Sequence, residues 1–133
     1  MASVFTRIMD GELPGRFVWQ DDVCTAFLSI NPLAQGHTLV VPRVEVDHWL
    51  DLEPVVVAHL FEVAGDVGRA QRRAFGANRI GLMIAGLEVP HTHLHVVPIS
   101  GVHDLDFANA IADPDPADLD AAAAAIVAAL DVA

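Results

Sequence analysis

The sequence predicts an α+β domain in which helices cover an antiparallel sheet. Five short segments have the β-branched and apolar composition of strands, and the connections between them are short. Two longer segments have the spacing or composition of helices. With 133 residues, 53% of them hydrophobic, the chain suits one domain with one core, and we expect a single domain spanning residues 1–133.

The amino-terminal third predicts a short helix followed by three strands. Residues 3–12 fit a helix that Ser3 would cap. Residues 17–20 and 23–30 have strand composition on either side of a two-aspartate turn, which predicts a hairpin. Residues 37–42 are apolar enough for a third, buried strand.

The remainder predicts the main helices and two further strands. Residues 52–75 place apolar side chains at helical spacing, with Pro54 in the first turn. Residues 80–85 fit a fourth strand, and residues 101–115 are acidic and loop-like. An alanine-rich helix then begins at the Asp-Pro pair of residues 115–116.

Residues 90–98 stand out because three histidines alternate with Thr92 and Leu94. We interpret this segment as the fifth strand, which would place His91, His93 and His95 on one face, roughly 6.5–7 Å apart at each step. Three imidazoles in a row do little for the stability of a sheet, because each buried ring needs a partner. The pattern therefore indicates a functional site, either for a metal or for nucleophilic chemistry.

A metal site would need about three nitrogen or oxygen ligands around one point. His91 and His93 could provide two of them, and candidates for the third are His37, Glu88 and His95. The chain has no CxxC pair and no HxxxH pair on a helix. This alternative therefore predicts a bound zinc or iron that is lost when His91 is replaced.

Nucleophilic chemistry at phosphorus is the other interpretation. A neutral imidazole can attack phosphorus and form a phosphohistidine, which divides one difficult step into two. The middle ring would attack, a neighbouring ring could donate a proton to the leaving group, and a preceding glycine loop at residues 86–89 would hold phosphate oxygens.

Charge and composition restrict the partners. The net charge is −11, with seven arginines and no lysine, which argues against binding to nucleic acid. No apolar run reaches the roughly 18 residues that a membrane helix requires, and no secretory signal is visible. The single cysteine, Cys24, fits a buried strand position. We therefore expect a cytoplasmic protein with a small-molecule ligand, no membrane contact and no nucleic acid partner.

The chain also resembles a known protein family in several segments. The segment from His91 to Val97 matches the HxHxHxx motif of the histidine triad (HIT) nucleotide-binding family. Residues 4–14, 26–32 and 36–43 resemble the segments that precede this motif in the family. The likeness covers residues 3–98, so residues 101–133 form a carboxy-terminal extension with an extra helix.

The resemblance implies a HIT-like fold, a five-stranded antiparallel sheet with two main helices, usually in a homodimer. It implies hydrolysis or transfer at the α-phosphate of a nucleotide, typically a purine nucleoside phosphoramidate, a nucleotidyl conjugate or a dinucleoside polyphosphate. It implies no cofactor. Some relatives bind structural zinc through an amino-terminal CxxC pair and histidines, but here Ser3, Thr6 and Glu45 stand at those positions, so we predict no metal.

Residue roles also follow from the resemblance. His93 matches the nucleophile, His91 a ring near the leaving group, and His95 a ring that supports the α-phosphate. His37 matches a histidine beside the triad. The positions that match a base pocket are apolar: Phe5, Ile8, Leu13, Phe27 and Ile30.

Three residues depart from the family pattern. Ser29 stands where the family has a longer residue that holds the ribose, and Leu87 and Glu88 stand where it has glutamine and a hydroxyl residue that contact phosphate. Leucine cannot donate a hydrogen bond, and an ionised Glu88 would repel phosphate. A nucleotide-binding module with little turnover is therefore the alternative to an enzyme.

Overall fold

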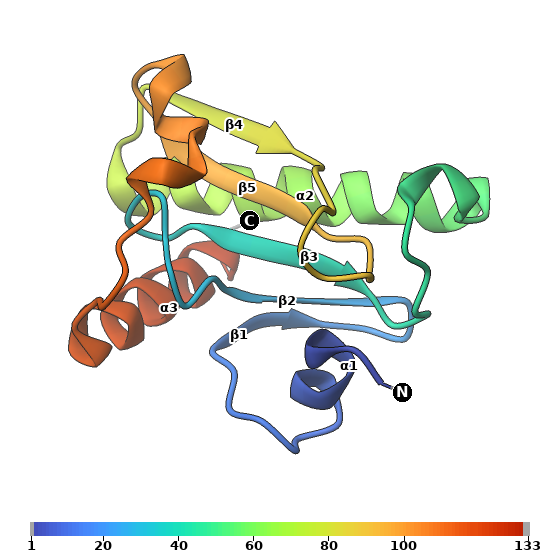
Figure 1. The fold of residues 1–133 in the computed structure, drawn as a ribbon. Coiled ribbons are helices and arrows are strands. Elements are labelled where there is room, and N and C mark those ends of the chain that lie inside the picture. The colour runs from blue at the N-terminus through green and yellow to red at the C-terminus, as the bar shows by residue number, and fades with distance from the viewer. Residues whose placement is uncertain (1, 132–133) are drawn as a thin grey trace.

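The computed structural model describes residues 2–131 and contains one five-stranded antiparallel sheet, as predicted. Its strand order is β1-β2-β3-β5-β4 (Figure 1). The strands are β1 Phe17–Gln20, β2 Cys24–Leu28, β3 Thr38–Pro42, β4 Arg79–Met83 and β5 Leu94–Ile99. The helices are α1 Val4–Met9, α2 Pro54–Phe75 and α3 Pro116–Leu130, with 3-10 turns η1 Trp49–Asp51, η2 Val102–Leu105 and η3 Phe107–Asn109.

The helix ends follow the signals in the sequence. Ser3 caps α1 by accepting a hydrogen bond from the Thr6 amide. Pro54 occupies the first turn of α2, and Gly76 ends that helix in the left-handed conformation, at a φ of 62°. The Asp115 side chain caps α3 by accepting from the Ala117 amide.

The two faces of the sheet carry different elements. Helices α2 and α3 cover one face, where alternate side chains of β2, β3 and β5 form the larger core (Figure 1). The short helix α1 lies on the opposite face and inserts Phe5 into a smaller cluster with Phe27, Leu39 and Val41. Because both faces are covered, every residue of β2 and β3 is buried.

The histidine segment differs from the prediction at its beginning. Strand β5 starts at Leu94 instead of residue 90, so His91 and His93 precede the strand and only His95 lies in it. The ladder between β3 and β5 ends at the pair Val40 and Leu94. Pro42, near the end of β3, has no amide hydrogen to extend it. Other contacts must therefore fix the first two imidazoles.

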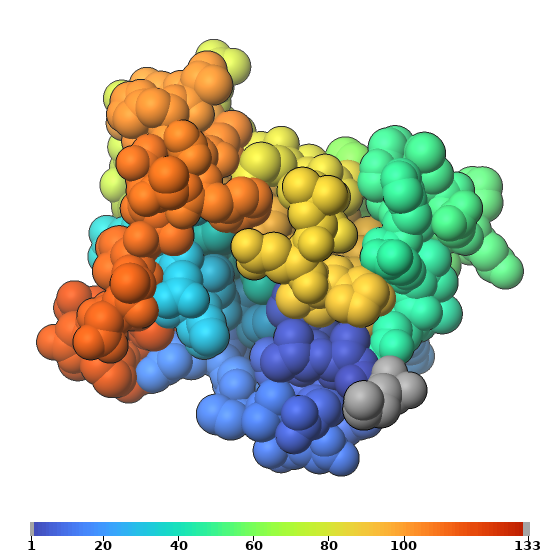
Figure 2. Space-filling view, viewed as in Figure 1, coloured from blue at the N-terminus to red at the C-terminus, as the bar shows by residue number. Residues whose placement is uncertain are grey.

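The segment after β5 returns across the end of the sheet. The Ile111 amide donates to the Pro32 carbonyl, and the Asn31 side chain donates to the carbonyls of Ile111 and Ala112. This orange segment and the yellow segment before β5 border a recess on one face of the molecule (Figure 2). Helix α3 then packs on α2 and β1.

Within residues 2–131, no helix combines the length and the apolar character needed to cross a bilayer.

Candidate active site

His93 and His95 lie side by side on the face of the sheet that α1 covers. His95 is paired with Leu39 on β3, and Leu39 is paired with Phe27 on β2, so all three side chains share that face. The ring centroids of His93 and His95 are 4.8 Å apart, and Phe5 of α1 lies 4.8 Å from His93 on its other side. Two imidazoles thus meet beside Phe5 of the smaller core.

A backbone carbonyl fixes the tautomer of His93. The Nδ1 atom lies 2.7 Å from the carbonyl oxygen of His91. Because a carbonyl oxygen can only accept, Nδ1 carries the hydrogen and the lone pair of the neutral ring is on Nε2. Among residues 2–131 no hydrogen bond occupies this Nε2 atom, and it is not one of the buried polar atoms that lack a partner. Its lone pair is therefore available for attack.

His95 is in the other tautomer, with its hydrogen on Nε2. The Leu33 amide determines this tautomer indirectly, by way of the His37 ring. The Leu33 amide donates to Nδ1 of His37 at 3.0 Å, so the hydrogen of that neutral ring is on Nε2. This Nε2–H lies 2.9 Å from Nδ1 of His95 and donates to it. The hydrogen of His95 is then on Nε2, and no described group accepts it. The site presents one free lone pair next to one free N–H donor.

Burial keeps these rings neutral. Desolvation, with a smaller contribution from neighbouring imidazoles, lowers the pKa of His37 to about 4 and the pKa of His95 to about 3. Desolvation also lowers the pKa of His93. At neutral pH His93 is therefore unprotonated, as a nucleophile requires.

We expect the free energy of unfolding to decrease as the pH is lowered from 7 to about 4. The unfolded chain protonates histidines near pH 6.5, whereas folded His37 and His95 bind protons only near pH 4 and pH 3. Within that window the unfolded state holds more protons, so stability rises with pH by at most about 1.4 kcal/mol per pH unit for each such ring.

Urea denaturation at several pH values measures this slope. His103→Gln should leave the slope unchanged, since the His103 side chain is 78% exposed. His37→Gln should reduce it. A stability that stays constant between pH 7 and pH 4 would contradict the neutral, buried state of these rings.

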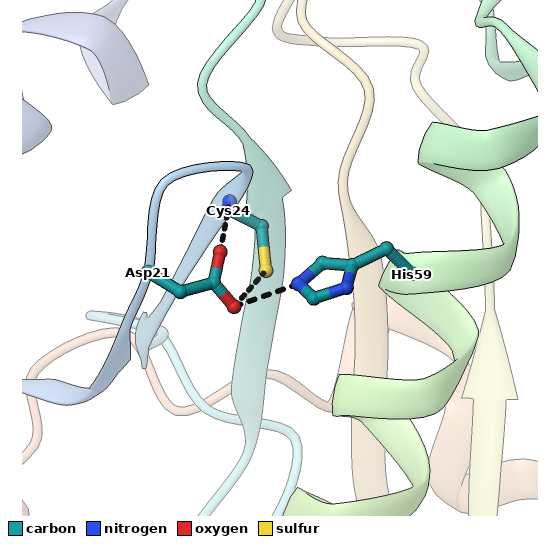
Figure 3. Close-up of side chains that lie close together, drawn as sticks. All are labelled: Asp21, Cys24 and His59. Carbon is teal, nitrogen blue, oxygen red and sulfur yellow. Dashed lines mark hydrogen bonds and ion pairs between the residues drawn. The ribbon is translucent and has the colours of Figure 1, made fainter.

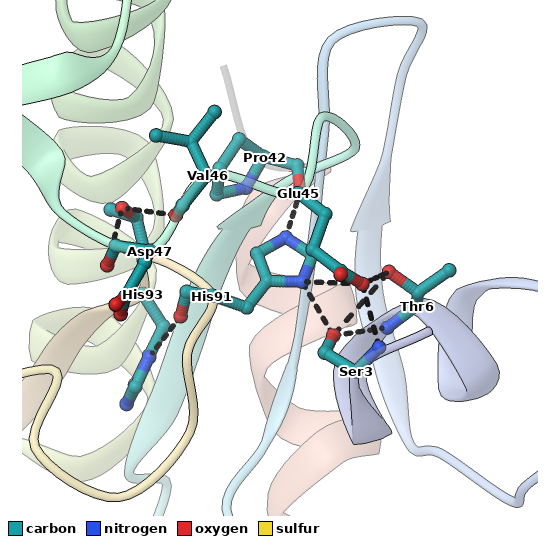
Figure 4. A network of polar contacts seen from close by, with 9 residues as sticks. Ser3, Thr6, Pro42, Glu45, Val46, Asp47, His91 and His93 are labelled. Atoms are coloured by element: carbon teal, nitrogen blue, oxygen red, sulfur yellow. Dashed lines mark hydrogen bonds and ion pairs between the residues drawn. The ribbon is translucent and has the colours of Figure 1, made fainter. Parts of the chain in front are cut away.

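His91 is placed differently from His93 (Figure 4). Its ring is fully buried, with Nε2 2.7 Å from the Pro42 carbonyl and Nδ1 2.6 Å from the Ser3 hydroxyl. The resemblance implied a ring near the leaving group. With both nitrogens engaged and no exposed surface, the His91 ring is better suited to support the site than to contact substrate.

Of the expected base-pocket residues, Phe5 contacts the ring of His93, and the five differ in exposure. Phe5 and Phe27 are buried with their centroids 5.7 Å apart, and Ile8 packs against the same cluster. Leu13 is partly buried and Ile30 is 69% exposed. Ser29 is partly buried, with its hydroxyl accepting from the Asn31 amide. Their role in binding a nucleoside stays a prediction.

The loop before the histidines carries Leu87 and Glu88 at the surface. Leu87 is 93% exposed, and Glu88 is exposed as well. The Glu88 carboxylate is close enough that its charge favours protonation of His93, although burial still lowers the pKa of that ring overall. A negative charge therefore lies near the His93 ring.

Two contacts of the site have no clear signal in the sequence. Phe107 lies edge-on to His95, with centroids 5.1 Å apart, although its segment was expected only to be an acidic loop. The Ser3 hydroxyl reaches His91 across 88 residues of sequence. An aromatic residue in an otherwise acidic loop was the only hint of the first contact.

A second cluster, formed by Asp21, Cys24 and His59, offers ligand atoms within 4.8 Å of one another (Figure 3). Asp21 accepts hydrogen bonds from His59, the Trp19 indole and the amides of Val23 and Cys24. Burial and the Asp21 carboxylate raise the pKa of the buried Cys24 thiol to about 12. These bonds are complete without a cation, so the cluster anchors α2 to the β1–β2 turn.

This chain is similar in sequence and fold to known proteins. A family model described as the HIT domain matches residues 10–101. An uncharacterized HIT-like protein of Borreliella burgdorferi is 36% identical over 102 residues, which cover 71% of this chain and 73% of that protein. The adenylylsulfatase HINT3 of Arabidopsis thaliana is 32% identical over 100 residues, 71% of this chain and 51% of the plant protein. A Zn-bound histidine triad family protein from Mycobacterium smegmatis is 31% identical with a TM-score of 0.84, and the match covers 98% of this chain and 94% of that one.

Proposed function

Because this chain belongs to the histidine triad (HIT) family, a family of nucleotide-binding proteins, we propose that it hydrolyses or transfers nucleotidyl groups through a covalent intermediate on His93. The proposal is supported above all by the opposite tautomers of two adjacent rings. His93 offers a lone pair on Nε2, and His95 offers an N–H on Nε2. One can bond to phosphorus while the other donates to an oxygen on that phosphorus.

The first step forms a bond from His93 Nε2 to the α-phosphorus and breaks the bond from phosphorus to the leaving group. The leaving group departs with the electron pair of that bond, and an amine takes a proton from solvent water. The negative charge that develops on the phosphoryl oxygens is stabilised by the N–H of His95. In the second step water attacks phosphorus and releases a proton to solvent, and the bond to Nε2 breaks, which returns the lone pair to His93.

The proposed substrate is a nucleotide with an activated α-phosphate and few charges. The adenylylsulfatase name of the Arabidopsis relative fits this class, since adenylyl sulfate is a nucleotidyl conjugate. The net charge of −11 and the nearby Glu88 disfavour long polyanions. Nucleoside phosphoramidates and nucleotidyl conjugates are therefore favoured over dinucleoside polyphosphates, with a purine as the expected base.

Structural zinc does not suit the residues found here. Ser3, Thr6 and Glu45 do come together, and they meet His91, but two of these four groups are neutral hydroxyls instead of thiolates or imidazoles. A metal held by the three triad histidines is also disfavoured, because both nitrogens of His91 are already hydrogen-bonded.

A trapping experiment tests the proposal directly. The protein is mixed with adenosine 5′-phosphoramidate or adenylyl sulfate, quenched within milliseconds to seconds, and digested for mass spectrometry. We expect an adenylyl group on the peptide that contains His93, together with release of AMP over time. Release of AMP without any adduct on this peptide in either reaction would reject the intermediate.

A binding module with little turnover is the second candidate, and the Leu87 and Glu88 side chains favour it. If they weaken the phosphate site, Leu87→Gln combined with Glu88→Ser should increase kcat/KM by about 10-fold, because a donor replaces a repelling carboxylate. Steady-state kinetics of the double variant and of each single variant measure the gain. Leu50→Gln, at another highly exposed leucine, is the control. Unchanged kinetics in the double variant would argue against this account.

The resemblance suggests a homodimer, and we further propose that the two copies pair through β4. This strand forms one edge of the sheet, and a groove of about 470 Å³ between it and α2 is lined by apolar side chains and arginines. Leu82 and Phe61 are 41% and 44% exposed there. Sedimentation of the wild type and of Leu82→Asp distinguishes a dimer from a monomer.

A further inference from the structure

Contacts from distant segments hold the first two histidines of the triad in place, because they lie outside the ladder of β5. The Val46 carbonyl accepts hydrogen bonds from the amide and the hydroxyl of Thr92, each at 2.8 Å. The Pro42 carbonyl and the Ser3 hydroxyl hold the two ring nitrogens of His91. The residues after β3 and the start of α1 therefore clamp this segment from two sides.

The hydrogen bonds of His91 have one consistent direction. The Pro42 carbonyl can only accept, so Nε2 carries the hydrogen of the neutral ring. The Nδ1 atom must then accept from the Ser3 hydroxyl, whose oxygen in turn accepts from the Thr6 amide. Burial lowers the pKa of His91, which keeps the ring in this neutral form.

Glu45 holds Ser3 in the position that this arrangement requires (Figure 4). One oxygen of its carboxylate accepts from the Ser3 amide at 2.6 Å and from the Thr6 hydroxyl at 2.8 Å. Those hydrogen bonds lower the pKa of Glu45, so the group is ionised at neutral pH. The same oxygen lies 4.0 Å from Nδ1 of His91, with the Ser3 hydroxyl beside them.

We propose that Glu45 is a positioning residue for His93, acting through Ser3 and His91; this inference rests on the proposed function. The carbonyl of His91 accepts the Nδ1 hydrogen of His93, so the place of His91 sets both the tautomer and the direction of the nucleophile. Glu45 itself does not touch the reacting atoms. Glu45 acts on the geometry of the site, because the hydrogen bonds that it accepts from the Ser3 amide and the Thr6 hydroxyl hold Ser3 in place.

Two substitutions separate this geometric role from a role of the charge. Glu45→Ala removes both acceptors and should reduce kcat by about 10–100-fold, because small displacements of a reacting group have effects of that size. Glu45→Gln keeps an oxygen that can accept both bonds and should stay within about threefold of the wild type. Affinity for AMP, measured by calorimetry, should change by less than about twofold in both variants.

The matched control is Glu12→Ala, which removes a carboxylate just after the same helix, where the Glu12 side chain is 61% exposed and pairs with Arg7. If Glu45→Ala does not fold, Ser3→Ala tests the same link, with Ser3→Thr as its rescue. Nitrogen-15 NMR of the His93 ring provides a readout that does not depend on turnover. Wild type and Glu45→Gln should show the hydrogen on Nδ1, and Glu45→Ala a mixture of tautomers.

Two results would overturn the inference, and a third would affect only the proposed function. An unchanged kcat and an unchanged His93 tautomer in folded Glu45→Ala would overturn the inference. A loss in Glu45→Gln as large as that in Glu45→Ala would also overturn it, because charge would then be the cause. If the wild type shows no turnover, the proposed function fails, but the NMR comparison still decides whether Glu45 positions His93.

Discussion

Replacing His93 with alanine is expected to reduce turnover of adenosine 5′-phosphoramidate by about 10⁴-fold or more. The proposed nucleophile is the Nε2 lone pair, whose direction is set by the 2.7 Å hydrogen bond from Nδ1 to the His91 carbonyl. Without it, no covalent intermediate can form, and the remaining donors can only polarise the phosphate. Release of AMP, followed by chromatography over hours, has the dynamic range to measure this loss.

Nucleotide affinity and folding should survive this substitution. His93 is 6% exposed and lies outside the β5 ladder, so the alanine variant should retain its thermal transition and bind AMP within about an order of magnitude of the wild type. His103→Ala, at an exposed imidazole, is the control and should keep full activity. Equal rates of AMP release from His93→Ala and wild type would reject His93 as the nucleophile.

Gly36→Ala is expected to cost about 2–4 kcal/mol of unfolding free energy. Gly36 has a φ of 84°, which costs an alanine about 1 kcal/mol. The added methyl group would also lie 2.9 Å from Cζ of Phe75 and closer still to Cε2, so a packed ring must move, at about 1–3 kcal/mol. The Gly36 carbonyl, which accepts from Gln71 and Thr38, would be displaced with it.

Gly11→Ala separates the cost of the positive φ from the cost of the steric contact with Phe75. Gly11 has the same φ of 84°, but nothing lies within 4 Å of the added methyl group, so only the backbone penalty should appear. Urea denaturation of both variants gives the difference between them. Equal losses would mean that the Phe75 ring relaxes at no cost. Because Gly36 precedes His37, we also expect its variant to lose activity.

Local signals in the sequence were sufficient for most of the fold. The Phe17–Gln20 strand, the cap at Ser3 and the proline at the start of α2 are all found as predicted, because each depends on residues close in sequence. The start of β5 was predicted wrongly, because alternation alone cannot show whether a partner strand is present. Pro42, which lacks an amide hydrogen, was the available signal that the ladder stops.

The candidate site was also predictable only in part from the sequence. Alternation singled out the three imidazoles, and the family resemblance placed His37, already a candidate metal ligand, beside the triad, where it contacts His95. The sequence could not show that the Leu33 amide and the His91 carbonyl give neighbouring rings opposite tautomers. Nor could it show that Ser3 and Glu45 meet at His91, since these contacts form only when three distant segments pack together.

The short helix α1 has a consequence for the temperature at which this chain loses activity. It has six residues, of which only Phe5 is buried, and an element with so little buried surface opens at a lower free energy than the rest of the domain. On the proposed arrangement, release of Ser3 from His91 would misplace the reactive nitrogen of His93 while the sheet, α2 and α3 remain intact. Activity would then depend on the attachment of α1, and inactivation on heating would precede melting of the domain.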